Sequence, residues 1–381
     1  MAYFDNAATT FPKPDCVYTF MEKFYRTSGG NSGRGIYALA DSSKHMIDET
    51  RDLLGQLLCC GSKQVIFTPT ATVALNMIIQ GTIAGGAKNI YISPFEHNAV
   101  TRTLNHFERR GEISVTELDV TFDLEFDLAR IKNQFERRRP DFVIVSHASN
   151  VIGLIAPVEE IFSLAKIYGA TTLVDMAQTA GLVELNVGLE AIDFAVFAGH
   201  KSLFAPTGIA GFVMNPSTQL EPVIFGGTGF DSANQDMPAT LPEKFEPGTL
   251  NIVGIAGLNA ALKWIQSQTV EKIFAAEESR RHQLLELFAD YDFLRVVGNV
   301  AGRNYVGIVS CLVEGMSSDV AGNIFSERGI AVRSGLQCAP LAHKFLGTFP
   351  AGTIRFSVNC MTTDKDFDEL RGVLDEIQFE M

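Results

Sequence analysis

The chain has 381 residues, 46% of them hydrophobic, and carries a formal net charge of −13 at pH 7. These values are typical of a globular protein that is long enough for two hydrophobic cores. The negative charge argues against a nucleic-acid-binding surface, because phosphate contacts need clustered Lys and Arg. No apolar run approaches the length of a membrane span, and the polar, proline-containing start is unlike a signal peptide. We therefore expect no membrane association and a cytoplasmic location.

The cysteines are too few and too irregularly spaced for the disulfide framework of a chain this long. They form neither a Cys-x-x-Cys pair nor a Cys/His spacing typical of zinc ligands. We therefore expect a reducing compartment and no metal site. The cysteines lie at positions 16, 59, 60, 311, 338 and 360.

The N-terminal part of the chain is expected to be helical on either side of a glycine-rich loop. An amphipathic helix is predicted near 15–27, and the loop at 28–35 follows it. This loop has too many glycines to be fixed by its own backbone, so other parts of the molecule must order it. Asp41 or Ser42 is expected to cap a second helix that reaches about Leu58.

From residue 65 onward, short apolar strands alternate with turns and helices. Such alternation predicts an α/β fold with a mainly parallel sheet that helices cover on both faces. The expected strands are 65–67, 89–93, 113–118, 142–145, 172–174, 194–197 and 211–214. One helix is expected to start after the turn at 70–72 and to end at 79, and two others are expected at 128–138 and 158–167.

A second unit follows the loops around 226–247, where long parallel strand–helix units no longer occur. This change predicts a smaller α+β domain. We expect a large domain at 15–255 and a small domain formed by 1–14 and 256–381, which also carries the loop around Cys338. The small domain's predicted elements are helices near 254–266, 271–288 and 318–328, a strand at 330–333 and a final helix from 364.

Lys201 stands where the apolar strand 194–197 runs into a Gly-His-Lys sequence. A lysine at the mouth of an apolar strand is costly unless its charge is removed or matched. Desolvation lowers the pKa of a lysine, which is the condition for an amine that forms a Schiff base. The alternative is a solvated lysine that ends the strand and has no function. Asp175, at the end of another apolar strand, favours the functional interpretation.

Other polar side chains also follow strands, and open α/β sheets bind ligands at the carboxyl ends of their strands. Residues 70–72 suit a phosphate at a helix N-terminus, and His97 can stack on a ring. Asp175 can pair with a pyridinium nitrogen, and Gln178 can bond a phenolic oxygen, as pyridoxal phosphate (PLP) requires. Each residue also has an ordinary role as a helix cap, turn residue or core histidine, but their joint occurrence favours the cofactor. The strand-end residues are Thr72, His97, Asn150, Asp175, Gln178, His200 and Lys201.

Short motifs follow one another along the chain, at 4–9, 96–97, 149–153, 174–178, 199–201, 245–249 and 333–339. In this order they resemble the motifs of the class V, fold-type I PLP enzymes, and specifically those of the cysteine desulfurase and selenocysteine lyase branch. The resemblance covers nearly the whole chain. It implies a large α/β domain with a mainly parallel sheet and a smaller α+β C-terminal domain.

The resemblance also implies roles for the residues at the matching positions. Lys201 would form the Schiff base with PLP, and Asp175 would keep the pyridine nitrogen protonated so that the ring acts as an electron sink. His97 would stack on the ring as a catalytic and cofactor-binding residue, and Gln178 would contact the phenolic oxygen. The remaining cofactor contacts would come from the backbone of Ala71 and Thr72 at the phosphate, and from His200 and Asn150.

The substrate amino acid would be bound by residues outside the cofactor motifs. Arg355 matches an arginine that grips the substrate carboxylate with two hydrogen bonds, and Asn150 matches a second substrate-binding residue. Arg34 in the glycine-rich loop would line the same pocket. Thr249 matches a threonine that reaches the phosphate from the partner subunit, so the resemblance implies a homodimer.

Cys338 determines the chemistry that the resemblance implies. In desulfurases a cysteine on a mobile loop attacks the substrate sulfur as a thiolate and keeps it as a persulfide, leaving alanine. Arg333, His343 and Lys344 are close in sequence and are expected to lower the pKa of Cys338. The alternative is a buried, inert cysteine, but the neighbouring glycine and proline indicate a turn rather than a core strand.

Three positions depart from the family's pattern. Val73 stands where relatives commonly carry Glu, and Gly33 stands where close desulfurases often have His. Ala198 replaces a Ser or Thr that bonds the phosphate in many relatives. These changes leave the scaffold and the PLP site intact and bear on substrate preference.

We predict a homodimeric PLP enzyme that converts L-cysteine to L-alanine, holds the sulfur on Cys338 and passes it to an acceptor protein. One alternative is another PLP reaction on the same scaffold, which would leave Cys338 dispensable. Such a reaction could be transamination, an amino-acid lyase or racemase-type reaction, or cleavage of L-selenocysteine. The other is a non-catalytic dimeric sulfur-transfer scaffold. The joint presence of four site residues speaks against such a scaffold, namely Lys201, Asp175, His97 and Arg355.

Overall fold

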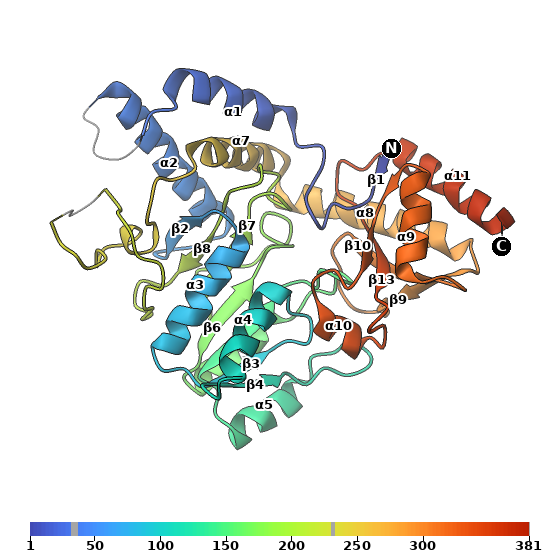
Figure 1. The fold of residues 1–381 in the computed structure, drawn as a ribbon, viewed down its shortest axis with the longest axis horizontal. Helices are drawn as coiled ribbons and strands as arrows, with labels where there is room; N and C mark the ends of the chain where they lie inside the picture. Colours follow the sequence, from blue (N-terminus) through green and yellow to red (C-terminus); the bar gives the residue numbers. More distant parts are fainter. Residues whose placement is uncertain (32–36, 230–232, 381) are drawn as a thin grey trace.

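The computed structural model describes residues 1–31, 37–229 and 233–380. A twisted sheet lies at the centre of its larger part, and the C-terminal residues lie to one side of that sheet (Figure 1). The strand order across the sheet is β2-β8-β7-β6-β5-β3-β4. The strands are β2 (Gln64–Thr68), β3 (Asn89–Ile92), β4 (Ser114–Glu117), β5 (Phe142–Ser146), β6 (Thr171–Asp175), β7 (Phe194–Ala198) and β8 (Ala210–Met214).

Five strands, β3 to β7, are parallel to one another, whereas β8 is antiparallel to both β7 and β2. The predicted mainly parallel sheet is therefore confirmed. Because β3, β5, β6 and β7 run in one direction, the residues that follow them meet at the same edge of the sheet. That edge is where the predicted site residues come together.

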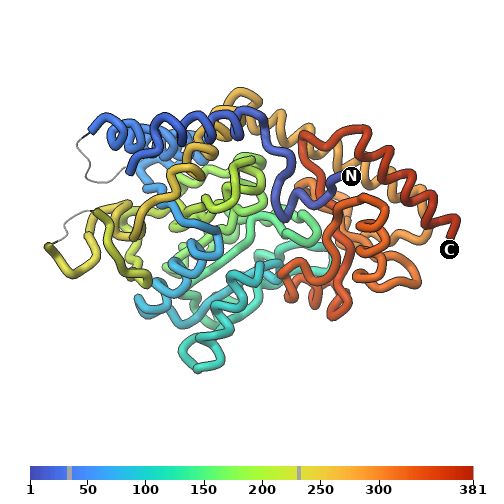
Figure 2. Tube along the Cα trace, turned by 45° about the horizontal axis from the view of Figure 1, so that its top comes forward, coloured from blue at the N-terminus to red at the C-terminus, as the bar shows by residue number. Residues whose placement is uncertain are grey.

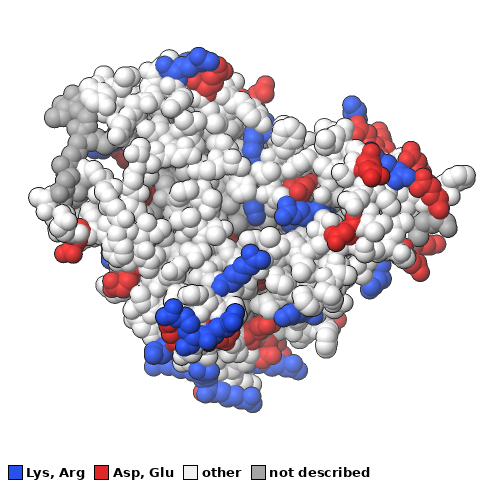
Figure 3. Space-filling view, in the orientation of Figure 1, with Lys and Arg blue, Asp and Glu red and all other residues white. Residues whose placement is uncertain are grey.

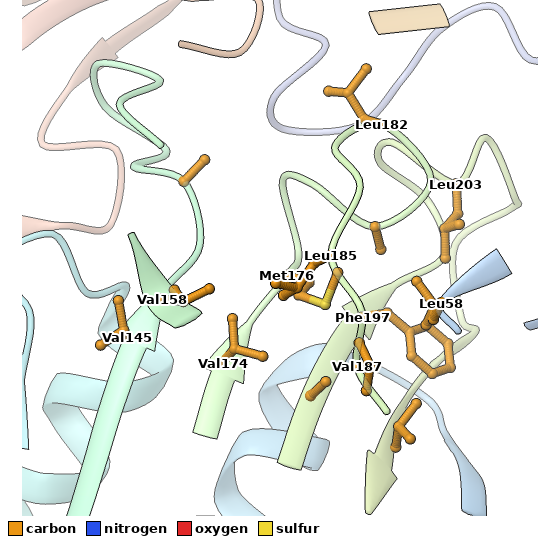
Figure 4. Close-up of a cluster of buried hydrophobic side chains, with 14 of the residues drawn as sticks. Leu58, Val145, Val158, Val174, Met176, Leu182, Leu185, Val187, Phe197 and Leu203 are labelled. Atoms are coloured by element: carbon orange, nitrogen blue, oxygen red, sulfur yellow. The ribbon is translucent and has the colours of Figure 1, made fainter. Parts of the chain in front are cut away.

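Side chains along the strands alternate between hydrophobic clusters on the two faces of the sheet. Val145 belongs to one cluster, whereas its neighbour Ile144 belongs to the other. Figure 4 shows part of the first cluster, where Val145, Val174 and Phe197 project from successive strands. Burial on both faces explains why these strands are continuous apolar runs in the sequence.

Helices cover both faces, as the alternation in the sequence predicted. Buried side chains of α3 (Ala71–Ala84) and α4 (Asn98–Glu108) belong to the cluster that contains Ile144. The opposite cluster receives side chains from α1 (Asp15–Ser28), α2 (Ala38–Leu57), α5 (Leu128–Arg137), α6 (Val158–Ile167) and α7 (Ile252–Gln268).

The C-terminal part forms an antiparallel sheet of order β12-β13-β10-β9, with a hydrophobic cluster of its own. Strand β1 (Ala2–Tyr3) pairs in parallel with β11 (Ile330–Ala331), so the start of the chain lies beside its C-terminal part (Figure 2). The other elements are η1 (Glu243–Phe245), α8 (Val270–Ala289), β9 (Leu294–Val297), β10 (Ile308–Val313), α9 (Ser318–Glu327), β12 (Arg333–Gly335), α10 (Pro340–Phe345), β13 (Thr353–Ser357) and α11 (Asp364–Glu380).

The predicted domain division at residue 255 stays a prediction. Buried side chains of α7 on both sides of that residue, among them Ile252 and Leu262, belong to the cluster of the large sheet. The first residues of the chain contribute Ala2 and Phe4 to the C-terminal cluster. Within 1–31, 37–229 and 233–380, no helix combines the length and apolar character needed to cross a membrane.

Some predicted elements differ from those in the structure. Helix α2 begins at Ala38 rather than after a cap at Asp41 or Ser42, because the preceding Ala-Leu-Ala residues are good helix formers. Helix α4 was not predicted, since its cap is His97 and its first turns contain weak helix formers. The predicted strand at 330–333 is divided between β11 and β12, which pair with different partners.

Candidate functional site

A cavity of about 310 Å³ lies at the carboxyl ends of the parallel strands, and we call it the central cavity. It is lined both by residues that follow strands of the large sheet and by residues of the C-terminal part. Most of the predicted site residues line it together, although they are spread along nearly three hundred positions. These residues are Ala71, Thr72, His97, Asn150, Asp175, Gln178, His200, Lys201, Cys338 and Arg355.

Lys201 and Asp175 form the charged centre of this cavity. The Lys201 residue is partly exposed to the cavity, but its ammonium group is enclosed, and this burial lowers the pKa of Lys201 to about 8. The Asp175 carboxylate opposes that shift, and the Arg355 guanidinium adds to it. Burial also raises the pKa of Asp175. The lysine therefore has a substantial neutral fraction near physiological pH, as a nucleophilic amine requires.

The N-terminus of α3 offers donors for an anion. Thr70 caps the helix by accepting a hydrogen bond from Val73 N at 3.2 Å, while the preceding N–H groups of Ala71 and Thr72 lie at the cavity. Nearby, His200 Nδ1 is buried and has no hydrogen-bond partner in the described part of the chain. These residues line the same cavity, and a helix N-terminus with free N–H groups suits a phosphate.

His97 and Glu96 link the ends of β3 and β5. His97 Nδ1 accepts a hydrogen bond from Ala99 N at 3.0 Å, and burial together with the charge of Lys201 lowers the pKa of His97 to about 4. The ring is therefore neutral. Glu96 is fully buried and accepts hydrogen bonds from Ser146 N and Ser146 Oγ at 2.6 and 2.8 Å. Burial raises the pKa of Glu96 to about 7, although these hydrogen bonds act in the opposite direction and lower it.

Arg355 brings a buried guanidinium to the cavity from β13. Its side chain is 3% exposed, and its two terminal nitrogens donate to Asn150 O at 2.9 Å and to Asp5 Oδ1 at 2.7 Å. The third nitrogen, Nε, is buried and finds no partner among the described residues. Burial lowers the pKa of Arg355 against the opposing effect of Asp5. An unused donor on a buried arginine suits an anionic ligand.

Cys338 is exposed and lies where the central cavity meets a groove of about 1050 Å³ that runs along α4. Its carbonyl oxygen accepts a hydrogen bond from Asn98 N at 2.7 Å. Arg333 lines both the cavity and the groove with it, as the sequence suggested. The expectation that His343 lowers the pKa of Cys338 is wrong. Both ring nitrogens of His343 bond other side chains, and burial lowers the pKa of His343 to about 4, so it carries no charge.

Among the described residues, one predicted site residue does not line the cavity. Thr249 is exposed and lies elsewhere on the same chain. Arg34, like the departure at Gly33, lies outside the described residues. Of the other departures, Ala198 lines the cavity without a hydroxyl, and Val73 packs partly against the cluster beneath α3.

The structure also adds residues to which the sequence gave no role. The N-terminal residues Ala7 and Ala8 line the cavity, and Gln178 Nε2 donates to Ala7 O at 3.0 Å. Their motif at 4–9 was recognised in the sequence, but nothing in it showed which strand end it would reach. Gln337 also lines the cavity. Among the residues that the structure describes, no cluster of His, Cys, Asp and Glu could hold a metal ion.

Comparisons with known proteins agree with this arrangement. The model of the aminotransferase class-V family matches residues 2–370. A probable cysteine desulfurase from Methanothermobacter thermautotrophicus is 30% identical, over 98% of this chain and 94% of the relative. Another from Vibrio cholerae is 30% identical, over 97% of this chain and 92% of its own length.

A solved structure gives the same result for the fold. The apo structure of a cysteine desulfurase from Thermococcus onnurineus superposes with a TM-score of 0.90 at 27% identity. The match covers 100% of this chain and 95% of that protein. The family resemblance and the fold class predicted from the motifs are thus confirmed. This chain belongs to the aminotransferase class-V family.

Proposed function

We propose that this protein is a PLP-dependent cysteine desulfurase that converts L-cysteine to L-alanine and keeps the sulfur on Cys338 as a persulfide. The observation that carries the proposal is that the Cys338 thiol shares one cavity with Lys201, Asp175 and Arg355. Relatives of nearly the same length, named as probable cysteine desulfurases, support it.

The residues around the cavity fit the cofactor. The unpartnered His200 Nδ1 and the first N–H groups of α3 suit the phosphate, and buried Asp175 suits the pyridinium nitrogen. The neutral ring of His97 suits stacking on the cofactor ring, and Gln178 keeps a second amide hydrogen for its phenolic oxygen. When bound to Lys201, PLP supplies the electron sink that stabilises negative charge on the substrate carbon.

Arg355 and Asn150 would bind the substrate amino acid. Nε of Arg355 is unused, and each terminal nitrogen keeps one hydrogen after its bond to the protein. A carboxylate can therefore accept two parallel hydrogen bonds from one edge of the guanidinium. The bonds to Asn150 O and Asp5 Oδ1 hold this edge in place.

Lys201 is the group placed to move protons during the reaction. With a pKa near 8, its Nζ can accept the proton from the substrate α carbon and later return one to carbon. Asp175 stays beside it in the buried centre and offsets part of the positive charge that Lys201 gains. His97 stays neutral, so it does not compete for this proton.

Cys338 would take the sulfur directly. Its thiolate attacks the substrate sulfur, a new S–S bond forms, and the bond between the substrate's β carbon and its sulfur breaks. The electron pair of the broken bond stays on carbon, which is protonated to give alanine, while Cys338 holds the persulfide. Exposure of Cys338 supports this role, because the residue lines both the central cavity and the groove.

A homodimer is part of the proposal. The C-terminal end of α1, the N-terminal end of α2 and the yellow loops before α7 lie at the same end of the molecule (Figures 1 and 2). In these segments Thr249 and several large apolar side chains are exposed. Pairing of this end would bury them and would bring Thr249 of one subunit to the phosphate site of the other. These side chains are Tyr25, Tyr37, Leu39 and Phe225, which are 60%, 50%, 49% and 72% exposed. Thr249→Ala should then weaken PLP binding in the dimer.

The groove beside Cys338 is our candidate for the docking site of a sulfur-acceptor protein. It joins the cavity at Cys338, and Arg102 and Arg333 line it. Figure 3 shows Lys and Arg gathered over α4 and α5 on this face. The same groove also carries Glu108 and Glu117. We therefore expect the acceptor to present a cysteine with acidic residues only where it faces Arg102 and Arg333. Arg102→Glu should slow sulfur transfer to such an acceptor more than it slows alanine formation.

The test is alanine release from L-cysteine by the purified protein loaded with PLP, with reductant present. The wild-type protein and Cys16→Ala, which removes another exposed cysteine, should form alanine, whereas Cys338→Ala should retain its PLP and form none. Alanine formation by Cys338→Ala at the wild-type rate would overturn the proposal. Activity of that variant on L-selenocysteine alone would favour the selenocysteine lyase alternative.

A further inference from the structure

We propose that Gln337 and His343 are positioning residues for the Cys338 thiol, holding a strained turn in the one conformation that brings it to the substrate. This inference rests on the proposed role of Cys338 as the sulfur acceptor. The pair belongs to the C-terminal part of the chain. Gln337 borders the central cavity, whereas His343 is fully buried in α10.

The turn between β12 and α10 has an unfavourable backbone. Gln337 has a φ of 41° and Cys338 a φ of 58°, so two consecutive residues other than glycine adopt left-handed conformations. Side chains rarely permit this, and such conformations persist only where the surroundings over-determine them. Gln and Cys residues do not by themselves favour this backbone conformation. The hydrogen bonds of Gln337 and His343 supply the stabilisation that the turn needs.

The side chain of Gln337 ties the turn to β13 and to α10. It is 5% exposed, and its Nε2 donates to Thr353 O of β13 at 2.9 Å. Its Oε1 lies 2.7 Å from His343 Nε2. Because the amide nitrogen faces a carbonyl, the amide oxygen faces the histidine, and His343 Nε2 must donate.

His343 in turn is fixed by a second contact. Its Nδ1 lies 2.7 Å from Thr348 Oγ1, and no part of the histidine is exposed. With Nε2 donating, Nδ1 accepts from the hydroxyl, which defines one neutral tautomer. The chain of bonds from Thr348 through His343 to Gln337 therefore ties the turn to the end of α10. Every buried ring and amide atom in it has a partner, as a specific buried polar network requires.

The backbone of the turn is tied to the substrate site by two further bonds. Asn150 Nδ2 donates to Gln337 O at 2.6 Å, and Asn98 N donates to Cys338 O at 2.7 Å. Asn150 also offers its own carbonyl to Arg355, the expected carboxylate-binding residue. The position of the turn is thus fixed relative to Asn150 and Arg355, the residues that would hold the substrate. Loss of the anchor would displace the thiol relative to the substrate. The proposed cofactor contacts of Lys201, Asp175 and His97 would be unchanged, because no hydrogen bond within the described residues joins them to the turn.

The test compares Gln337→Leu and His343→Leu with the wild-type holoenzyme by hydrogen exchange and kinetics. Exchange of the backbone amides at 334–341 should accelerate in both variants, and kcat for alanine formation should fall about 10- to 100-fold, the range for small displacements of a reacting group. KM and the PLP absorbance should stay close to the wild-type values. His147→Leu, which removes another buried histidine bonded to a threonine, should not accelerate exchange at 334–341.

The double variant separates positioning from general damage. If the two residues act as one anchor, Gln337→Leu combined with His343→Leu should be no slower than the worse single variant. Unchanged exchange at 334–341 in Gln337→Leu would overturn the inference, as would a rise in KM with kcat retained. Hydrogen exchange reports on the turn even if Cys338→Ala shows that the desulfurase proposal is wrong, so the two failures are distinguishable.

Discussion

Arg355 donates through Nη2 to Asp5 Oδ1 at 2.7 Å, although the two residues are 350 positions apart in the chain. The contact joins the first residues of the protein to the guanidinium expected to bind the substrate carboxylate. The same N-terminal segment also reaches the cofactor side of the cavity, because Gln178 donates to Ala7 O and Thr9 Oγ1 donates to His200 O. The start of the chain thus connects the residues proposed to bind the substrate with those proposed to bind the cofactor.

Asp5→Ala should raise KM for L-cysteine about 10-fold, because a charge-assisted hydrogen bond of about 1.5–3 kcal/mol no longer orients Arg355. Asp5→Asn, whose amide oxygen can still accept from Nη2, should lie between Asp5→Ala and the wild type. Steady-state kinetics check this. Glu125→Ala, which removes the partner of the surface residue Arg303, is the control and should leave KM unchanged. An Asp5→Ala enzyme with the wild-type KM would contradict this role.

Glu277→Gln should change how the stability of the protein depends on pH. Burial raises the pKa of Glu277 from 4.5 to about 8, against a hydrogen bond from Gly307 N. Between pH 4.5 and about 8, Glu277 is protonated in the folded protein but ionised in the unfolded chain. The free energy of unfolding therefore falls as pH rises through this window, by up to about 1.4 kcal/mol per pH unit.

Urea unfolding across the same window measures that slope for Glu277→Gln and for a matched control. The glutamine variant should lose Glu277's contribution and gain stability relative to the wild type as pH rises. Glu278→Gln changes the exposed neighbouring residue and should keep the wild-type slope. Parallel curves for wild type and Glu277→Gln would show that Glu277 does not retain its proton in the folded state.

Ala198→Ser should tighten PLP binding. Ala198 lines the cavity at the end of β7 and is 2% exposed, so a hydroxyl there would be close to the expected phosphate. A hydrogen bond to a charged group contributes about 1.5–3 kcal/mol, which corresponds to roughly 10-fold or more in the dissociation constant. Titration of the cofactor-free protein with PLP, followed by absorbance, measures the change. Weaker binding by Ala198→Ser would place the phosphate elsewhere.

Lys201→Ala should abolish both the yellow colour of the bound cofactor and turnover. The reason is that Lys201 carries the amine with the lowered pKa at the centre of the cavity. Absorbance spectra of the purified variants check this, with Lys88→Ala as a control because Lys88 is exposed and remote from the cavity lining. A Lys201→Ala protein that keeps the wild-type spectrum would mean that another residue holds the cofactor.

The sequence predicted the large sheet, and it predicted that most candidate site residues would lie together, because both depend on local patterns. Strands buried on two faces are continuous apolar runs, and Asp175 and Lys201 follow such runs directly. Their convergence then follows from the parallel direction of β6 and β7. Helix α4 was missed because its capping residue, His97, is not a common helix cap.

The contacts that position the site could not be predicted in the same way. The bond between Asp5 and Arg355 joins opposite ends of the chain, and no local pattern encodes it. His343 was expected to act on Cys338 because the two are close in sequence, yet its ring points to Gln337 and Thr348 instead. Proximity in sequence does not determine which way a helical side chain faces in a helix as short as α10.

The most direct test of the proposed function is the mass of the Cys338 peptide after a single turnover of L-cysteine without reductant. We predict that one sulfur atom is added to that peptide and that alanine forms in an equal amount. The peptides carrying the exposed Cys16 and Cys59 should remain unmodified. Alanine formation with no sulfur on Cys338 would contradict the proposed route of the sulfur, whatever other residue then carried it.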